Sequence, residues 1–189
     1  MFRRSLLAAV LVTAAMPALA HSGHHSASGF LAGLSHPLGG LDHVLAMVSV
    51  GLFAALLGGQ ALWALPASFI AMMLMGGVLG LAGIEVPAVE FGIIASVITL
   101  GALVSLRRVW PVGAAMALVG VFAVFHGHAH GAEIPAGAGV TLYSLGFTLA
   151  SMSLHGLGVA FGAVTARQAH VGRLAGAVVA VAGIVLLVG

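Results

Sequence analysis

The stretch that decides how this chain is organised reads His36-Pro37-Leu38-Gly39-Gly40-Leu41-Asp42-His43-Val44-Leu45-Ala46-Met47. Proline disfavours helix at the residue before it, and paired glycines loosen the backbone that follows. We therefore expect a short apolar piece over 29–35, a break, and a regular helix over 41–59. Non-helical backbone at membrane depth is tolerated only where it is buried in protein or lines a water-filled cavity. The break thus predicts a site inside a helix bundle.

The composition indicates an all-α integral membrane protein. Of 189 residues, 61% are hydrophobic and 5% are charged, whereas a soluble domain carries about 25% charged residues. The six basic residues are all arginine, which is too few to indicate a nucleic-acid partner. There is no cysteine, so thiolate sites and disulfides are excluded. Ten histidines outnumber the four acids, and this favours metal chemistry.

The N-terminal region predicts export. Residues 1–20 combine two arginines, an apolar core and Ala18-Leu19-Ala20, the pattern of a signal peptide cleaved after Ala20. The alternative is an uncleaved first helix, for which the apolar core is short. Residues 21–28 would then form a His-rich periplasmic tail, which either attracts metal without forming a defined site or is a disordered polar tail.

The remaining chain, 29–189, is predicted to be one transmembrane domain of six helices, the first of them broken near Pro37–Gly40. Each apolar segment is about long enough for a hydrocarbon core of about 30 Å. Pairs such as Gly76-xxx-Gly80 and Gly158-xxx-Gly162 predict faces of close helix packing. The expected spans are 29–59, 61–83, 89–106, 109–125, 140–164 and 171–188, with a polar loop over 126–139.

Charge placement predicts the orientation. Six spans put every arginine of the mature chain in or beside the loops of one side, and the glutamates on the other. Arginine-rich loops face the cytoplasm, so both mature termini are expected in the periplasm and the protein in a bacterial inner membrane. The arginines are Arg107, Arg108, Arg167 and Arg173; the glutamates are Glu85, Glu90 and Glu133.

Three side chains of the opening stretch are candidate metal ligands: His36, Asp42 and His43. Asp42 could bind metal itself or orient a neighbouring imidazole as a hydrogen-bond acceptor. The alternative is that Asp42 caps the helix while both histidines lie at the membrane interface. A cap explains the aspartate alone and leaves the two histidines unexplained, so we favour a site.

A second cluster lies in Phe125-His126-Gly127-His128-Ala129-His130-Gly131-Ala132-Glu133. If helix continues through it, His126 and His130 share a face and His128 points elsewhere. The glycines also permit a loop that folds around an ion, and a surface loop without a role is the remaining alternative. Three imidazoles and one carboxylate within eight residues favour metal, with His126, His128, His130 and Glu133 as ligands.

A third feature is a polar stripe on the helix over 140–164. Ser144, Thr148, Ser151 and His155 fall on one face at helical spacing. Serine and threonine often hydrogen-bond between membrane helices, which explains the hydroxyls equally well, whereas His155 is a further candidate ligand. Ser96 and Thr99 on the third span are candidates to face the same track.

The ligand set suits borderline ions such as Ni²⁺, Co²⁺ and Zn²⁺ without separating them. Both motifs also resemble those of the HupE/UreJ family of nickel and cobalt permeases, His36-Pro37-x-x-Gly40-x-Asp42-His43 and Phe125-His126-Gly127-His128-Ala129-His130-Gly131-x-Glu133. The resemblance extends over nearly the whole chain. It implies uptake of Ni²⁺, with Co²⁺ as a further substrate, and an indirect link to hydrogenase or urease. It supports the seven motif ligands, while His155 depends on the stripe.

The sequence thus favours a secondary permease or a facilitated-diffusion channel for a divalent metal, with lipid as its surroundings and no prosthetic cofactor. Association with a second copy of the chain is left open. An intramembrane zinc-dependent hydrolase could use the same His and Asp residues, with Ser144 or Ser151 assisting. A metal sensor or chaperone is a third reading, for which six spans are more membrane than the task needs.

Overall fold

The computed structural model describes residues 29–135 and 137–189. The secondary-structure elements of these residues are all helices, joined by short loops. The predicted all-α class is confirmed. The expected signal peptide and the His-rich tail lie outside the described residues. The helices are α2 (Gly29–Ser35), the 3-10 turn η1 (His36–Leu38), α3 (Leu41–Leu57), α4 (Ala61–Leu81), α5 (Val89–Ser105), α6 (Val112–Ala132), α7 (Val140–Val164) and α8 (Ala169–Val188).

Length and hydropathy identify four helices that can cross a membrane, namely α4, α6, α7 and α8. The pair formed by α2–η1 and α3 passes the same test together, with a bend of 81° at the break, so up to five spans are counted. The predicted interruption near Pro37–Gly40 is therefore present. The 17 residues of α5 span about 26 Å at about 1.5 Å per residue, slightly short of a hydrocarbon core. By length and composition the described residues contain four or five candidate spans, and six remains an expectation.

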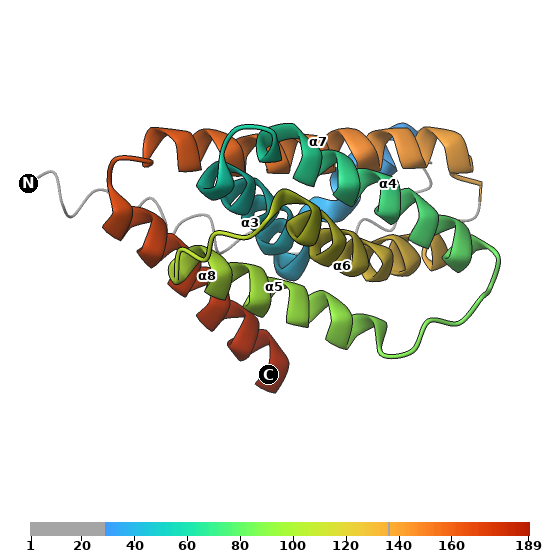
Figure 1. Cartoon of the computed structure of the whole chain (residues 1–189). Coiled ribbons are helices and arrows are strands. Elements are labelled where there is room, and N and C mark those ends of the chain that lie inside the picture. Colours follow the sequence, from blue (N-terminus) through green and yellow to red (C-terminus); the bar gives the residue numbers. More distant parts are fainter. Residues whose placement is uncertain (1–28, 136) are drawn as a thin grey trace, which may run out of the picture.

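Four pairs of neighbours build the bundle: α4 packs against α6, α5 against α8, and both α2 and α3 against α7. Figure 1 shows α3, α4, α6 and α7 gathered together, with α5 and α8 along one side. Fully buried apolar side chains such as Phe53, Phe69 and Leu100 fill the interior. Large apolar side chains on α4, α7 and α8 are exposed instead. So extensive an apolar exterior is what lipid, rather than water, covers.

Glycines let the helices approach closely, as predicted. A Cβ on Gly76 would run into the backbone carbonyl of Val124, and a Cβ on Gly127 into that of Met73. The α4–α6 pair is thus in backbone contact. The α3–α7 pair behaves in the same way, because a Cβ on Gly51 would meet the carbonyl oxygen of His155. The glycines therefore fix α6 and α7, the two helices that carry the buried histidines.

The segment over 126–139 corrects the sequence prediction. It was expected as a polar loop, but α6 continues through the histidine motif to Ala132. The α4 contact explains the difference, because glycines at 127 and 131 pack against α4 rather than loosening the backbone. A glycine normally weakens a helix by about 1 kcal/mol, and here close packing offsets that cost.

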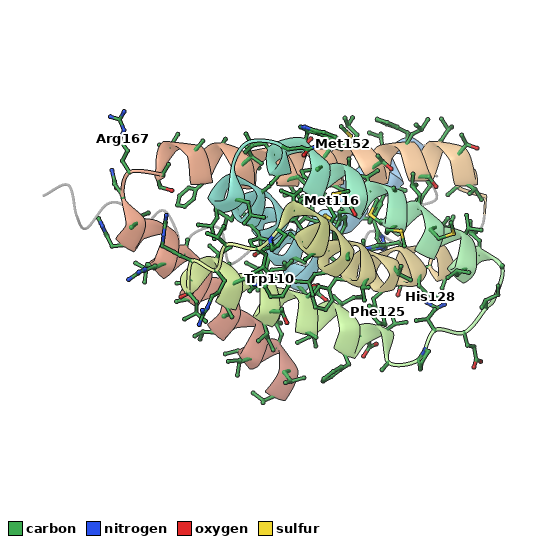
Figure 2. The ribbon with its side chains drawn as sticks, viewed as in Figure 1. Trp110, Met116, Phe125, His128, Met152 and Arg167 are labelled. Atoms are coloured by element: carbon green, nitrogen blue, oxygen red, sulfur yellow. The ribbon has the colours of Figure 1, made fainter. Side chains whose placement is uncertain are left out.

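The two ends of the bundle differ in charge. Glu90 lies in the first turn of α5, and Glu133 follows α6 and contacts His36 of η1. Figure 1 shows the start of α5 and the end of α6 at the same end of the bundle. The arginines at 107 and 108 follow α5, while Arg167 lies between α7 and α8 at the other end. Figure 2 shows Arg167 and His128 near opposite ends of the molecule. The segregation assumed in the orientation argument is thus present in three dimensions.

Candidate metal site

The outer part of the site is an open hollow between η1 and the end of α6. His36 Nε2 lies 3.4 Å from Glu133 Oε2. His36, His130 and Glu133 each offer one ligand atom, and these atoms lie within 4.8 Å of one another. The hollow has a volume of about 400 Å³ and also reaches Asp42 and His43. The break at Pro37–Gly40 is what brings His36 to the carboxyl end of α6.

This outer cluster has nearly the dimensions of a coordination site. Two imidazole nitrogens or carboxylate oxygens on opposite sides of an ion, each at about 2.1 Å, are about 4.2 Å apart. Only one pair of the three ligand atoms can be opposite, and at angles of 90–120° two ligands lie about 3.0–3.6 Å apart. Each of the three atoms therefore needs to move toward the ion by about an ångström. Glu133 is 64% exposed and His36 is 31% exposed, so water and ions reach the cluster, and flexible side chains can make that adjustment.

His130 connects the outer cluster to the interior. Its ring centroid lies 4.7 Å from that of His36 and 4.5 Å from that of His43. The side chain is buried, and neither ring nitrogen has a hydrogen-bond partner among the described residues. Phe147 covers the ring, with centroids 4.1 Å apart. His130 is thus held by packing, and either of its nitrogens, in the matching tautomer, is free to take a ligand role.

Asp42 contacts an imidazole directly. Its Oδ1 lies 2.7 Å from His43 Nδ1 and accepts the backbone N–H of His43 at 2.8 Å. A carboxylate only accepts, so Nδ1 carries the proton and Nε2 keeps its lone pair. Nε2 is buried and has no partner among the described residues. The helix N-cap is Gly40, not Asp42, and the contact between Asp42 and His43 is the one that the predicted orienting role requires.

The interior continues through His126 to His155. The His126 ring lies 5.1 Å from that of His43, and its Nε2 is 3.1 Å from the Ser96 hydroxyl. Phe69 then stands between two histidines, with centroids 5.5 Å from His126 and 5.0 Å from His155. His126 and His155 are 0% and 1% exposed. The rings of His36, His130, His43, His126, Phe69 and His155 form a continuous row from the hollow into the core.

The buried imidazoles leave hydrogen-bonding capacity unused. Six ring nitrogens of His43, His126, His130 and His155 are buried without partners among the described residues. An unpaired buried polar group costs about 1–3 kcal/mol, and native structures rarely keep several together. A purely structural core would place apolar side chains here. The unpaired nitrogens are the strongest structural reason to regard the row as a ligand-binding path.

His128 is the predicted ligand that the structure separates from the others. It lies on another face of α6, and its Nε2 is 2.8 Å from the carbonyl oxygen of Ile84, in the segment before α5 (Figure 2). The alternative in which helix continues and His128 points elsewhere is confirmed, and the loop folded around an ion is wrong. His128 therefore does not join the other predicted ligands.

The polar stripe of α7 enters the core only at its inner half. Ser151 and His155 are buried, while Ser144 and Thr148 are half-buried. The Ser151 hydroxyl donates to the Phe147 carbonyl at 2.9 Å and lies 3.9 Å from Met73 Sδ. Ser96 and Thr99 were expected to face this track, but the side-chain contact of Ser96 outside its own helix is with His126 of α6, and Thr99 is half-buried. Phe69 was not predicted, because one phenylalanine in an apolar span carries no sequence signal.

Comparisons with known proteins agree with the two motifs. The family model described as HupE / UreJ protein matches residues 8–186. The protein named Protein HupE from Rhizobium leguminosarum bv. viciae is 46% identical to this chain in an alignment of 189 positions. The alignment covers 98% of this chain and 98% of that protein. No solved structure matches the chain.

Proposed function

The chain belongs to the HupE/UreJ protein family, and on that premise we propose that it is a permease for a divalent metal ion, with Ni²⁺ as the first substrate and Co²⁺ as the second. The observation that carries the proposal is the row of imidazoles between the open hollow and His155. Imidazole and carboxylate ligands suit these borderline ions.

The ion first meets the outer cluster. The Glu133 carboxylate attracts the cation from water, and His36 and His130 replace part of its water shell. His130 is the natural hand-over point, because its ring contacts those of both His36 and His43. Several binding positions of similar strength allow the ion to enter and to leave again, which a single tight site would prevent.

The ion next reaches the buried imidazoles. Nε2 of His43, held ready by Asp42, and the free nitrogen of His126 supply ligands at this depth. His155 is the following station, beyond the Phe69 ring. Eight residues serve in this scheme, with His128 as a peripheral member that helps to collect metal at the outer surface.

Direction follows from charge and potential. We assign the arginine end to the cytoplasm and the glutamate end to the periplasm of a bacterial inner membrane, with both mature termini periplasmic and six spans. An inward-negative potential favours movement of a dication into the cell by about 4.6 kcal/mol per 100 mV, twice the single-charge value. Imported nickel would serve metalloenzymes such as hydrogenase or urease, and a homo-oligomer is compatible with the exposed apolar faces.

A zinc-dependent hydrolase remains the second candidate, since three buried imidazoles could hold Zn²⁺ with an open position. The serine chemistry supports it less well. The Ser151 hydroxyl donates to a carbonyl of its own helix rather than to a base. Behaviour of the metal separates the two: a hydrolase retains it through purification, and a permease exchanges it.

The test is accumulation of radioactive Ni²⁺ and Co²⁺ in cells that express the wild-type chain, Asp42→Ala or His43→Ala. We expect accumulation above the vector control for the wild type and loss of at least about tenfold in both variants, the lower end of the effect of removing a residue that orients a metal ligand. Membrane abundance is measured in parallel. Unchanged accumulation in both variants at equal abundance would contradict the proposal.

A further inference from the structure

We propose that Ser96 of α5 is a positioning residue for the metal path, because it fixes the His126 imidazole with its proton on Nε2 and so makes Nδ1 the metal ligand. This inference rests on the proposed function. It adds α5, a helix that carries none of the ligands predicted from the motifs, to the machinery of the site.

The assignment follows from counting protons. A serine hydroxyl has one hydrogen to donate. The Ser96 hydroxyl donates it to the Ile93 carbonyl at 2.6 Å. The same oxygen lies 3.1 Å from His126 Nε2. Since its hydrogen is already used, the hydroxyl must accept there, and Nε2 must carry the proton. Nδ1 of a neutral imidazole then keeps the lone pair.

The surroundings of His126 reinforce this choice. Ser96 and His126 are both 0% exposed, so bulk water does not compete for either ring nitrogen. Nδ1 has no partner among the described residues. A lone pair buried without a donor costs free energy unless something binds it, and a divalent cation supplies that partner.

His43 and His126 are arranged in a complementary way. The proton of His43 lies on Nδ1, because Asp42 accepts it, while the proton of His126 lies on Nε2, because Ser96 accepts it. The two rings, 5.1 Å apart and nearly perpendicular, therefore keep different nitrogens unprotonated, Nε2 of His43 and Nδ1 of His126, and both nitrogens are buried. The carboxylate and the hydroxyl play the same part, each holding one imidazole in one tautomer.

The ordinary alternative is that Ser96 is structural. A serine in a membrane helix commonly bonds a carbonyl three or four residues earlier in its own helix, and the Ile93 bond is of that kind. If this were its whole role, replacement by alanine would leave metal ligation at His126 unchanged. Metal binding and its spectrum therefore distinguish the two roles.

The experiment titrates the purified full chain in lipid nanodiscs with Co²⁺, whose visible spectrum reports its ligands. We expect Ser96→Ala to weaken Co²⁺ binding by about 10–100-fold, as loss of such an orienting partner typically does, and to change the spectrum as His126→Ala does. Ser96→Thr, which retains the hydroxyl, should stay close to the wild type. Ser68→Ala is the matched control, because the Ser68 hydroxyl donates to the backbone carbonyl of Met116 on α6 and forms no hydrogen bond with a histidine among the described residues.

A second measurement needs no metal. Solid-state ¹⁵N NMR of histidine-labelled protein distinguishes the two imidazole tautomers, and His126→Gln identifies the signal. We expect the Nε2-protonated form of His126 in the wild type and a shift of population in Ser96→Ala. Thermal unfolding of each variant checks folding. If the methyl of Ser96→Thr prevents folding, the Ser96→Ala comparison carries the test.

The outcomes separate this inference from the proposed function. Wild-type protein that binds no Co²⁺ overturns the proposed function, and the metal role of Ser96 with it. Wild-type protein that binds Co²⁺ with the same affinity and spectrum as Ser96→Ala overturns the role of Ser96 alone. An Nδ1-protonated His126 in the wild type also overturns it.

Discussion

His128 and His130 are two residues apart in one helix, yet they lie in different surroundings. The His130 ring is buried between those of His36 and His43, and both of its nitrogens lack partners among the described residues. The Nε2 of His128 instead contacts the carbonyl oxygen of Ile84, outside the row of imidazoles. The three histidines of the motif, at alternate positions, are therefore not brought together, because the helix distributes its members over different faces.

The glycines of the motif explain which face is which. Gly127 and Gly131 pack against the backbone of α4 at Met73 and Gly77. With that face fixed, the histidine that precedes each glycine turns toward the interior. The glycines thus orient the ligands, although they do not bind anything themselves.

The largest expected effect separates the two histidines directly. His130→Ala should lower Ni²⁺ accumulation by at least about tenfold. Loss of a residue that only orients a metal ligand already lowers metal affinity or activity by about tenfold or more, and the His130 ring contacts those of both His36 and His43. His128→Ala should stay within about twofold of the wild type. Isotope uptake at equal membrane abundance measures both. Equal loss in the two variants would contradict the division of the motif.

Acidification should have the next largest effect. Protons compete with metal for imidazole nitrogens, and histidine changes charge between about pH 5 and 8. We expect Ni²⁺ uptake to fall steeply below about pH 6 and His128→Ala to follow the wild-type curve. Uptake measured from pH 5 to 7.5 with the membrane potential held constant checks this. A flat profile would argue against imidazole ligation.

Gly127→Ala tests the face of α6 that packs against α4. The added methyl would meet the Met73 carbonyl, and overpacking of this kind costs about 1–3 kcal/mol. The melting temperature in detergent should fall. Gly156→Ala on α7 is the control, because a Cβ there has open space. If both variants melt like the wild type, α4 does not fix the orientation of α6.

The smallest effect is expected at Glu133, which lines the open hollow between η1 and the end of α6. Glu133→Gln removes an exposed carboxylate beside His36, and a surface ion pair is worth about 0.2–1 kcal/mol, or about 1.4- to 5-fold. Uptake should therefore fall by a few-fold at limiting metal and recover at saturating metal. Higher ionic strength should shrink the difference, because salt screens exposed charges. A loss that saturating metal does not restore would place Glu133 in the row itself.

Much of the fold and part of the site could be predicted from the sequence. The apolar composition predicts a helical membrane protein, and the Pro-Gly-Gly break is present as an 81° bend. The loop predicted over 126–139 is wrong for residues 126–132, where glycine content suggested a loop but α4 supplies contacts that stabilise helix. The described residues from Glu133 to Gly139 are non-helical, as predicted. The short α5 also leaves the six-span count as a prediction.

The sequence alone determined which side chains could bind a borderline metal, because ligand chemistry is a property of residue type. It also determined where the backbone breaks, because proline and glycine act on their immediate neighbours. Only the tertiary structure decided that His130 joins His36 and His43, that Phe69 stands before His155, and that Ser96 meets His126. These contacts join residues far apart in the chain, so they depend on how the helices pack and not on local sequence.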